Sequence, residues 1–237
     1  MPIGAASGFA LPGCECGSVP LARRLIGAGV PRGAALAFML SAPAINPVVL
    51  AATAVAFAGQ PDIVVARAGA SLVAATVVGL VWQRWAKPAW TACTTGEEHH
   101  DAGGRWQTFV VTLRDDGATA GGFLVVGAAA AAAIQTFVPA SWIETVAGHE
   151  AAAIATMAAL AVLLSVCSEA DAFIAASLTQ FSRTAQLTFM VVSPFADLKI
   201  LALQAGVFGR RFVLRFAPLA IGTAVAAAVA AGALLGW

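Results

Sequence analysis

The stretch "RGAALAFMLSAPAINPVVLAATAVAF", residues 32–57, decides the fold, because it is long and apolar enough to cross a bilayer yet contains two prolines and an asparagine. A hydrocarbon core about 30 Å thick needs about 20 helical residues. Proline inside such a helix removes a hydrogen bond and frees a carbonyl group that lipid cannot satisfy. Pro43 and Pro47 therefore predict a broken membrane helix over 33–59, with its break facing protein or a water-lined cavity.

The same pattern recurs in the second half of the chain. A shift of 151 residues aligns the stretch with "RTAQLTFMVVSPFADLKILALQAGVF", residues 183–208, and seven aligned pairs are identical without being alanine. They are Arg32/Arg183, Leu36/Leu187, Phe38/Phe189, Met39/Met190, Pro43/Pro194, Leu50/Leu201 and Phe57/Phe208, and the shift also aligns Asn46 with Asp197 and Cys16 with Cys167. The repeat predicts a second broken helix over 184–206. Both breaks are expected near the membrane midplane, where transporters built from repeats bind their substrates.

The whole chain has the composition of an integral membrane protein. Apolar residues make up 60% of it and charged residues 11%, and the mean hydropathy is +0.86; these values lie outside the range of soluble domains. Further membrane helices are expected over 62–84, 119–138 and 217–237, with a polar loop over 85–118. The predicted fold class is all-α and polytopic, with the lipid bilayer as a partner. A net charge of +1 gives no reason to expect nucleic acid.

Arginine positions predict the orientation, because loops rich in Lys and Arg stay in the cytoplasm. The polar loop and the segment after the second broken helix carry such residues, whereas "GQPD" and "PASWIETVAGHE" carry none. Both arginine-rich loops lie inside only if residues 151–182 form a re-entrant hairpin with "CSEAD" at its tip. By the repeat, residues 13–20 form the matching tip, which enters from the cytoplasmic side.

The chain is then two inverted repeats, each a re-entrant hairpin followed by a proline-broken helix. The first repeat spans 1–84, the cytoplasmic loop 85–118 and the second half 119–237. The residues expected to hold this architecture together are Pro43, Pro47, Pro194, Arg23, Arg24, Arg32 and Arg183.

Three motifs carry a resemblance to a known family: "CECGSVPLARRLIGAGVPRGAALAFMLSAPAINP", "CSEADAFIAASL" and "SPFADLKILALQAGVFGRRF". Together they resemble the predicted-permease family that includes the organoarsenical efflux permeases. The resemblance implies a multi-pass permease of the inner (plasma) membrane and no enzymatic activity. The common family form is Cys-Ser-Cys-Gly, where this chain has Glu15 between Cys14 and Cys16. Helices usually precede this motif in the family, so the resemblance leaves open whether the N-terminus is complete.

Cysteines at both tips suggest the substrate class. Thiolates are soft ligands, and trivalent arsenicals are soft electrophiles that bond to them. The candidate substrate ligands are Cys14, Cys16 and Cys167 at the tips and Ser41, Asn46, Ser193 and Asp197 at the breaks. The alternative is that a membrane cysteine is simply a small apolar residue.

Ionisable side chains at membrane depth are candidates for ion coupling, because charge is costly there. Those candidates are Glu15, Glu169, Asp171 and Lys199. The alternative is structural pairing, in which Glu15 or Asp171 binds one of the cations Arg23, Arg24, Arg183 and Lys199.

The leading functional hypothesis is a secondary transporter that exports a small, thiol-reactive substrate such as a trivalent organoarsenical. One alternative is a membrane thiol redox protein, although Cys-x-Cys is not the usual Cys-x-x-Cys redox spacing. Another is a structural subunit of a larger membrane complex, and a homo-oligomer is compatible with each hypothesis. No cofactor is expected, and no metal either: "EEHHD" (97–101) has glycine-rich flanks and is interpreted as a solvated loop.

Overall fold

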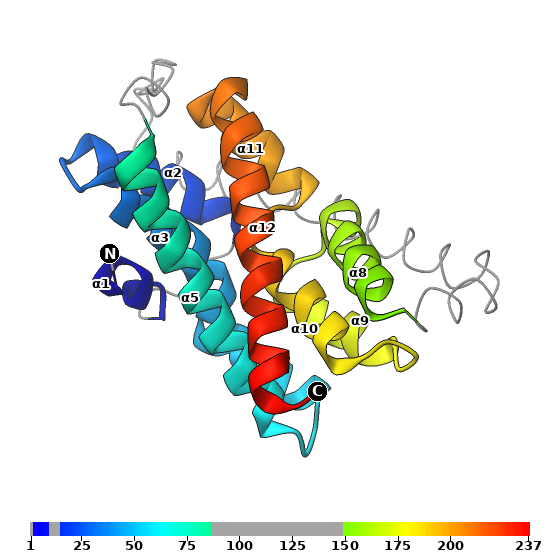
Figure 1. Cartoon of the computed structure of the whole chain (residues 1–237). Helices are drawn as coiled ribbons and strands as arrows, with labels where there is room; N and C mark the ends of the chain where they lie inside the picture. Colours follow the sequence, from blue (N-terminus) through cyan, green and yellow to red (C-terminus); the bar gives the residue numbers. More distant parts are fainter. Residues whose placement is uncertain (1, 10–14, 87–148) are drawn as a thin grey trace, which may run out of the picture.

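The computed structural model describes residues 2–9, 15–86 and 149–237, and every regular element in these ranges is a helix (Figure 1). The first half comprises α1 (Pro2–Ala6), the short 3-10 helix η1 (Ser7–Phe9), α2 (Glu15–Gly27), α3 (Arg32–Ile45), α4 (Pro47–Ala56) and α5 (Pro61–Trp85). The second half comprises α8 (Glu150–Leu164), α9 (Asp171–Ser177), α10 (Arg183–Val192), α11 (Leu198–Phe208) and α12 (Arg210–Leu235). The expected all-helical fold is confirmed for these ranges. Most of the predicted 85–118 loop and the predicted 119–138 helix lie outside the described residues.

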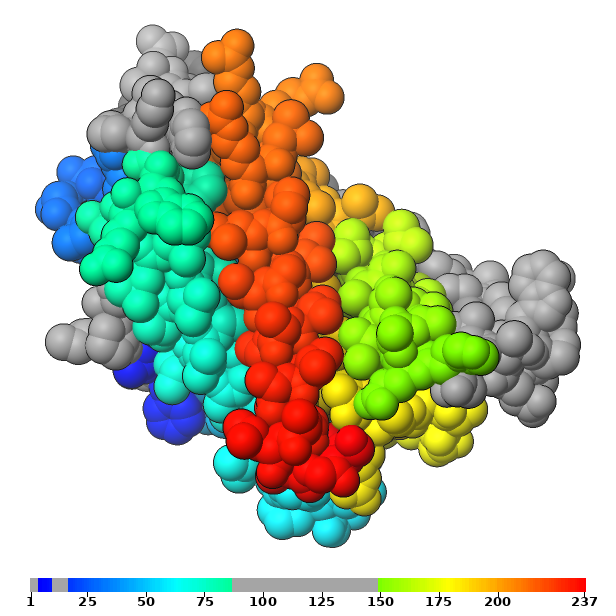
Figure 2. All heavy atoms as spheres, viewed as in Figure 1, coloured from blue at the N-terminus to red at the C-terminus, as the bar shows by residue number. Residues whose placement is uncertain are grey.

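Three stretches of the described chain are long and apolar enough to cross a membrane: α3 with α4, α5, and α12. Figure 2 shows α12 open to its surroundings along its length, between α5 and α8. A long helix that leaves one apolar face unburied is expected of a protein surrounded by lipid.

The first membrane stretch breaks at Asn46, between α3 and α4. Pro43 lies inside α3, whereas Pro47 is the first residue of α4, where its missing N–H removes no helical hydrogen bond. The Val49 N–H donates to the Asn46 Oδ1 at 2.9 Å, so the asparagine caps α4 within a fully packed environment in which it is only 2% exposed. The break therefore comes from an N-cap followed by proline.

The second half of the chain contains a break of the same kind, between α10 and α11. After α10 the chain turns through residues 193–196, which include Pro194, and Asp197 caps α11. The Ile200 N–H donates to the Asp197 Oδ1 at 2.5 Å. Asp197 and Ile200 lie 151 residues after Asn46 and Val49, so the two halves use aligned residues for the same cap.

Replacing Asn46 with alanine is expected to lower the free energy of unfolding by about 1 kcal/mol, the usual cost of losing an N-cap acceptor. Asn46→Ser should retain most of the stability, because a serine hydroxyl can accept the same hydrogen bond, as Ser182 does from Ala185 N–H at 3.2 Å at the start of α10. Denaturant titration of the detergent-solubilised protein, followed by far-ultraviolet circular dichroism, measures the difference. Equal stability of both variants would contradict the capping role.

A helical hairpin precedes the second break. α8 ends at Leu164, and the left-handed backbone of the following Ser165 (φ 47°) turns the chain into residues 166–170. α9 then leads back toward α10. The aligned helices α2 and α9 differ in length. α2 has 13 residues but α9 only 7, because the chain turns at Leu178, whose carbonyl accepts from Gln186 Nε2 at 3.0 Å.

α5 and α12 pack against each other and run in opposite directions (Figure 1). Trp82 of α5 makes edge-to-face contacts with Phe212 and Phe216 of α12, at 5.1 and 5.2 Å between ring centroids. α12 begins well before the predicted residue 217, because Gly209, with φ 89°, makes a tight turn directly after α11. The prediction of a loop carrying the three arginines is therefore wrong. Arg210, Arg211 and Arg215 lie in the first two turns of α12.

The two halves exchange contacts. α2 packs against α3 of its own half and against α11 of the other half, and α9 packs against α10 of its own half and α4 of the other. Each helix that follows a predicted hairpin tip therefore contacts the helix that follows the break in the opposite half. This exchange brings the loop before α9 close to both broken helices.

Candidate functional site

Cys167 lies in the loop between α8 and α9 and is not part of a disulfide. The Lys199 Nζ lies 3.9 Å from the Cys167 Sγ and 3.7 Å from the Asp197 Oδ2. The Lys199 side chain is 6% exposed and that of Asp197 is 0% exposed. The second break thus brings a thiol, an ammonium group and a carboxylate together inside the protein.

Two hydrogen bonds attach this loop to the second break. The Leu198 N–H donates to the Ser165 Oγ at 3.1 Å, and the Ser193 Oγ donates to the Val166 carbonyl at 3.5 Å. Serine hydroxyls on both sides therefore satisfy backbone groups that the two interrupted helices leave free. Cys167 follows directly, so its position is tied to the geometry of the break.

On its other side the same loop contacts Arg67, a fully buried residue of α5. The Arg67 Nη2 lies 2.8 Å from the Asp171 Oδ2 and donates to the Ser168 carbonyl at 3.1 Å, and Nη1 donates to the Thr53 Oγ1 at 2.8 Å. Both charged side chains are 0% exposed. The guanidinium group joins α4, α5 and the start of α9, since its forked donors reach an acceptor on each.

The partner of Asp171 corrects the sequence prediction. The sequence predicts ion coupling for Asp171 and, as the alternative, structural pairing with Arg23, Arg24, Arg183 or Lys199; the ion pair in the structure is with Arg67. Arg183 instead pairs with Asp62 at 3.2 Å, where both side chains are exposed, and lies 5.8 Å from the ring centroid of Trp237. The reason is the packing of α9 between α4 and α10, which turns Asp171 toward α5.

Arg67 was missed because the 62–84 span was treated as uniformly apolar. A signal was present, since an arginine in the second turn of an apolar membrane helix is itself a functional candidate. Its partner could not be found from sequence, because Asp171 lies 104 residues away and no periodicity connects them.

Of the other predicted ligands and coupling residues, some have described side chains and some do not. Ser41 donates to the Phe38 carbonyl of its own helix at 3.2 Å and Asn46 caps α4, while Glu169 is half-buried in the turn before α9. Cys14 lies outside the described residues, and the side chains of Glu15 and Cys16 are likewise not described. Substrate or ion binding by these residues stays a prediction. Among the described residues no group of three or more His, Cys, Asp or Glu could hold a metal ion.

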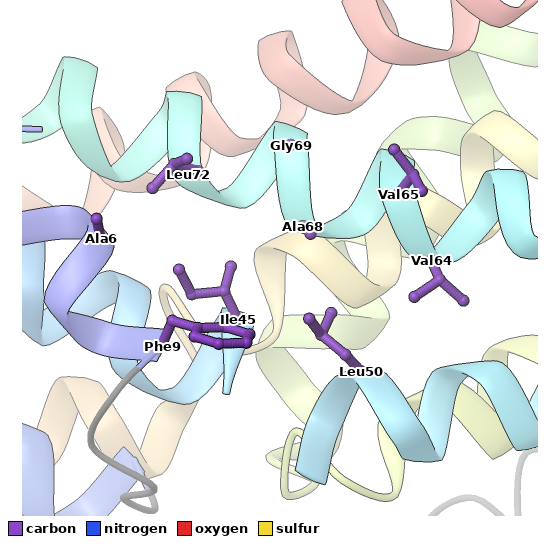
Figure 3. A pocket seen from close by; sticks show the side chains of 9 residues that line it. All are labelled: Ala6, Phe9, Ile45, Leu50, Val64, Val65, Ala68, Gly69 and Leu72. Atoms are coloured by element: carbon purple, nitrogen blue, oxygen red, sulfur yellow. The ribbon is translucent and has the colours of Figure 1, made fainter. Parts of the chain in front are cut away.

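An open apolar groove lies beside the first break. It has a volume of about 580 Å³ and lies between η1, the α3–α4 junction and α5. Figure 3 shows that Phe9, Ile45, Leu50 and Leu72 point toward it and that its labelled side chains carry no polar atom. The groove therefore offers nothing to bind a charged or thiol-reactive group, in contrast to the loop around Cys167.

Comparisons with known proteins agree with this architecture. The family described as "Predicted permease" (ArsP_1) matches residues 1–236. The UPF0718 protein YcgR of Bacillus subtilis (strain 168) is 37% identical over 216 residues, which cover 89% of this chain and 74% of the relative. A protein of Streptococcus mutans serotype c is 33% identical over 218 residues, covering 88% of this chain and 72% of the relative, and its name describes it as a subunit of a two-component membrane permease complex. No solved structure matches the chain.

The family match spans nearly the whole chain, and the helices long enough to cross a membrane make a multi-pass architecture the natural one. The chain therefore belongs to the predicted permease family.

Proposed function

We propose that this permease is a secondary transporter of the inner membrane that exports a small, thiol-reactive substrate, such as a trivalent organoarsenical. Its substrate site would lie near the membrane midplane, between the two hairpin tips and the two broken helices. The observation that carries the proposal is the position of Cys167, which faces Lys199 at 3.9 Å beside the capped second break. An ammonium group at that distance can balance the charge of a thiolate, the form of cysteine that bonds to soft electrophiles.

Three observations support two inverted repeats. The caps at Asn46 and Asp197 occupy aligned positions. The contacts of α2 with α11 and of α9 with α4 correspond under the same alignment. α5 and α12, the helices that end the two repeats, are antiparallel (Figure 1), as expected of units with opposite orientation in the membrane.

The described arginines support an orientation with the start of α12 in the cytoplasm. The Gly33 N–H donates to the Gln83 Oε1 at 2.9 Å, so α3 starts where α5 ends, at the end of the molecule where the antiparallel α12 begins. That end carries Arg23, Arg24, Arg32, Arg84, Arg210, Arg211 and Arg215, whereas the opposite end of the described helices carries Arg183. An excess of arginine marks the cytoplasmic side.

The coupling groups of the proposal are Glu15, Glu169 and Lys199, whose charge is costly at membrane depth. Asp171 is paired with Arg67, the kind of structural role that was the alternative for it. Cys14 and Cys16 would supply further thiols from the other tip.

Cys167→Ser is the decisive variant, because serine keeps the size of the side chain and removes the soft ligand. We expect efflux of a trivalent organoarsenical from cells expressing the variant to fall by about tenfold or more, the scale on which such a site loses affinity when its geometry is disturbed. Cys93→Ser is the control and should transport normally, because Cys93 lies in the predicted polar loop, away from the proposed site. Normal efflux by Cys167→Ser, with equal protein in the membrane, would refute the thiol site.

A second candidate function is that of a structural subunit in a larger membrane complex. One observation favours it: the Streptococcus mutans relative is named as a subunit of a permease complex. In that case the Cys167→Ser protein would transport normally and the chain would co-purify with a second membrane protein. A thiol redox protein would instead show a disulfide between Cys14 and Cys16 that forms and breaks with the redox state of the medium.

A further inference from the structure

A second cavity opens where the two halves exchange contacts, at the ends of α4 and α9. It has a volume of about 390 Å³ and is called the vestibule here; it is lined by Ala56, Phe57, Ala58, Gln60, Ala176, Thr179, Phe181, Arg183 and Gln186. Unlike the apolar groove, it has amide, hydroxyl and guanidinium groups in its wall. It lies at the end of the molecule opposite the cluster of arginines, which is the outer end in the orientation proposed above.

The ion pair of Arg67 and Asp171 lies just beyond the inner end of the vestibule. On α4, Thr53 precedes Phe57 by one helical turn, and the Phe57 N–H donates to the Thr53 carbonyl at 2.9 Å. On α9, Asp171 precedes Ala176 by about 7.5 Å along the helix axis. Arg67 bridges Thr53 and Asp171 across the interface of the two helices, so it separates the vestibule from the loop behind it.

Cys167 lies directly behind this ion pair. The Arg67 Nη2 that contacts Asp171 also donates to the carbonyl of Ser168 at 3.1 Å, the residue next to Cys167. The vestibule, the ion pair, the thiol and Lys199 therefore follow one another, first along the α4–α9 interface and then through the loop before α9 to the start of α11. We propose that the Arg67–Asp171 ion pair is the gate that closes the Cys167 site from the outer vestibule. The inference rests on the proposed transport function, and names the exit route of the same site.

The chemistry of Arg67 fits a contact that opens and closes. Its Nε and the Oγ of Ser71, which is buried one turn further along the same face of α5, are fully buried and make no hydrogen bond with the described residues. Buried polar groups without partners are rare and call for an explanation. In an open state, water entering from the vestibule would reach both groups and replace the bonds that Arg67 gives up.

The other charged groups around this interface form ion pairs of their own or lie in the turn before α9. α4 carries no charged residue. Arg183 of α10 pairs with Asp62 at the outer rim, Lys199 and Asp197 pair on the far side of Cys167, and Glu169 is half-buried in the turn before α9. Removing the charge of Asp171 should therefore release the guanidinium group from α9.

Labelling of Cys167 tests the gate without measuring transport. In a Cys14→Ser, Cys16→Ser, Cys93→Ser background Cys167 is the sole thiol, and a membrane-impermeant maleimide is applied to right-side-out vesicles. Asp171→Asn is expected to raise the labelling rate by about tenfold or more, because the cost of opening would fall by at least about 1.4 kcal/mol. Asp62→Asn, which breaks the exposed pair with Arg183, is the matched control and should leave the rate unchanged.

Two further variants test the route and guard against misfolding. Asp171→Asn with Thr179→Trp, which fills the vestibule, should return the rate to that of the parent. Thr53→Val, which removes one bond of Arg67 and keeps the ion pair, should raise the rate by a smaller factor, and it replaces Asp171→Asn if that protein does not purify folded. A rate that does not rise, or that rises equally with Thr179→Trp present, overturns the gate. Such a result leaves the transport proposal standing if Cys167→Ser lowers efflux as expected. Normal efflux by Cys167→Ser refutes the transport site whatever the labelling rates.

Discussion

Replacing Arg67 with methionine is expected to lower the free energy of unfolding by about 3–5 kcal/mol, the usual cost of removing one partner of a buried ion pair. The Asp171 carboxylate, 0% exposed, would lose a charged donor at 2.8 Å, and the Ser168 carbonyl and Thr53 hydroxyl would lose their bonds to the same guanidinium group. Since a domain is stable by only about 5–15 kcal/mol, the variant should accumulate poorly in the membrane. Denaturant titration in detergent at a fixed protein-to-detergent ratio measures the loss.

Arg183→Met is the matched control for this prediction. It breaks the exposed pair with Asp62 and should cost less than about 1 kcal/mol, because solvent screens that pair. The double variant Arg67→Met with Asp171→Leu should be more stable than Arg67→Met alone, since no unpaired charge stays buried. If the double variant is instead less stable than the single one, the ion pair itself is not the source of the loss.

The broken helices could be predicted because their cause is local. Proline together with a residue able to cap a helix is visible in a few letters, and the repeat places a second copy 151 residues later. The two patterns predict breaks near Asn46 and Asp197, and the structure has an N-cap at each of these residues.

What the sequence could not supply depends on contacts between distant elements. The length of α9 follows from where the chain turns back onto α10, and the start of α12 follows from the positive φ of Gly209. Arg67 belongs to the same class: its burial is the result of α4, α5 and α9 meeting, and each of these helices looks ordinary alone. Periodicity and composition describe which faces are apolar, but they do not state which faces meet.

Gly79→Leu is expected to cost more than about 1–3 kcal/mol, the usual range for overpacking in a core. Gly79 of α5 faces α3 so closely that a Cβ atom would lie 2.6 Å from the Gly33 carbonyl oxygen and 2.9 Å from the Ala37 Cβ. The backbone of α3 cannot give way like a flexible side chain. The two helices would have to separate, and the break at the end of α3 would move with them, so efflux should fall together with stability.

Gly69→Leu on the same helix separates packing from helix propensity. A Cβ atom there would meet nothing within 4 Å, and leucine favours the helix over glycine by somewhat less than about 1 kcal/mol. Gly69→Leu should therefore be at least as stable as the parent, while Gly79→Leu is destabilised, in parallel denaturant titrations and efflux assays. Propensity alone would make both variants more stable. Small residues permit close contact between membrane helices. If only Gly79→Leu loses stability and efflux, the close contact between α3 and α5 holds the first break in place. If the two variants are equally stable and transport equally, this contact contributes little.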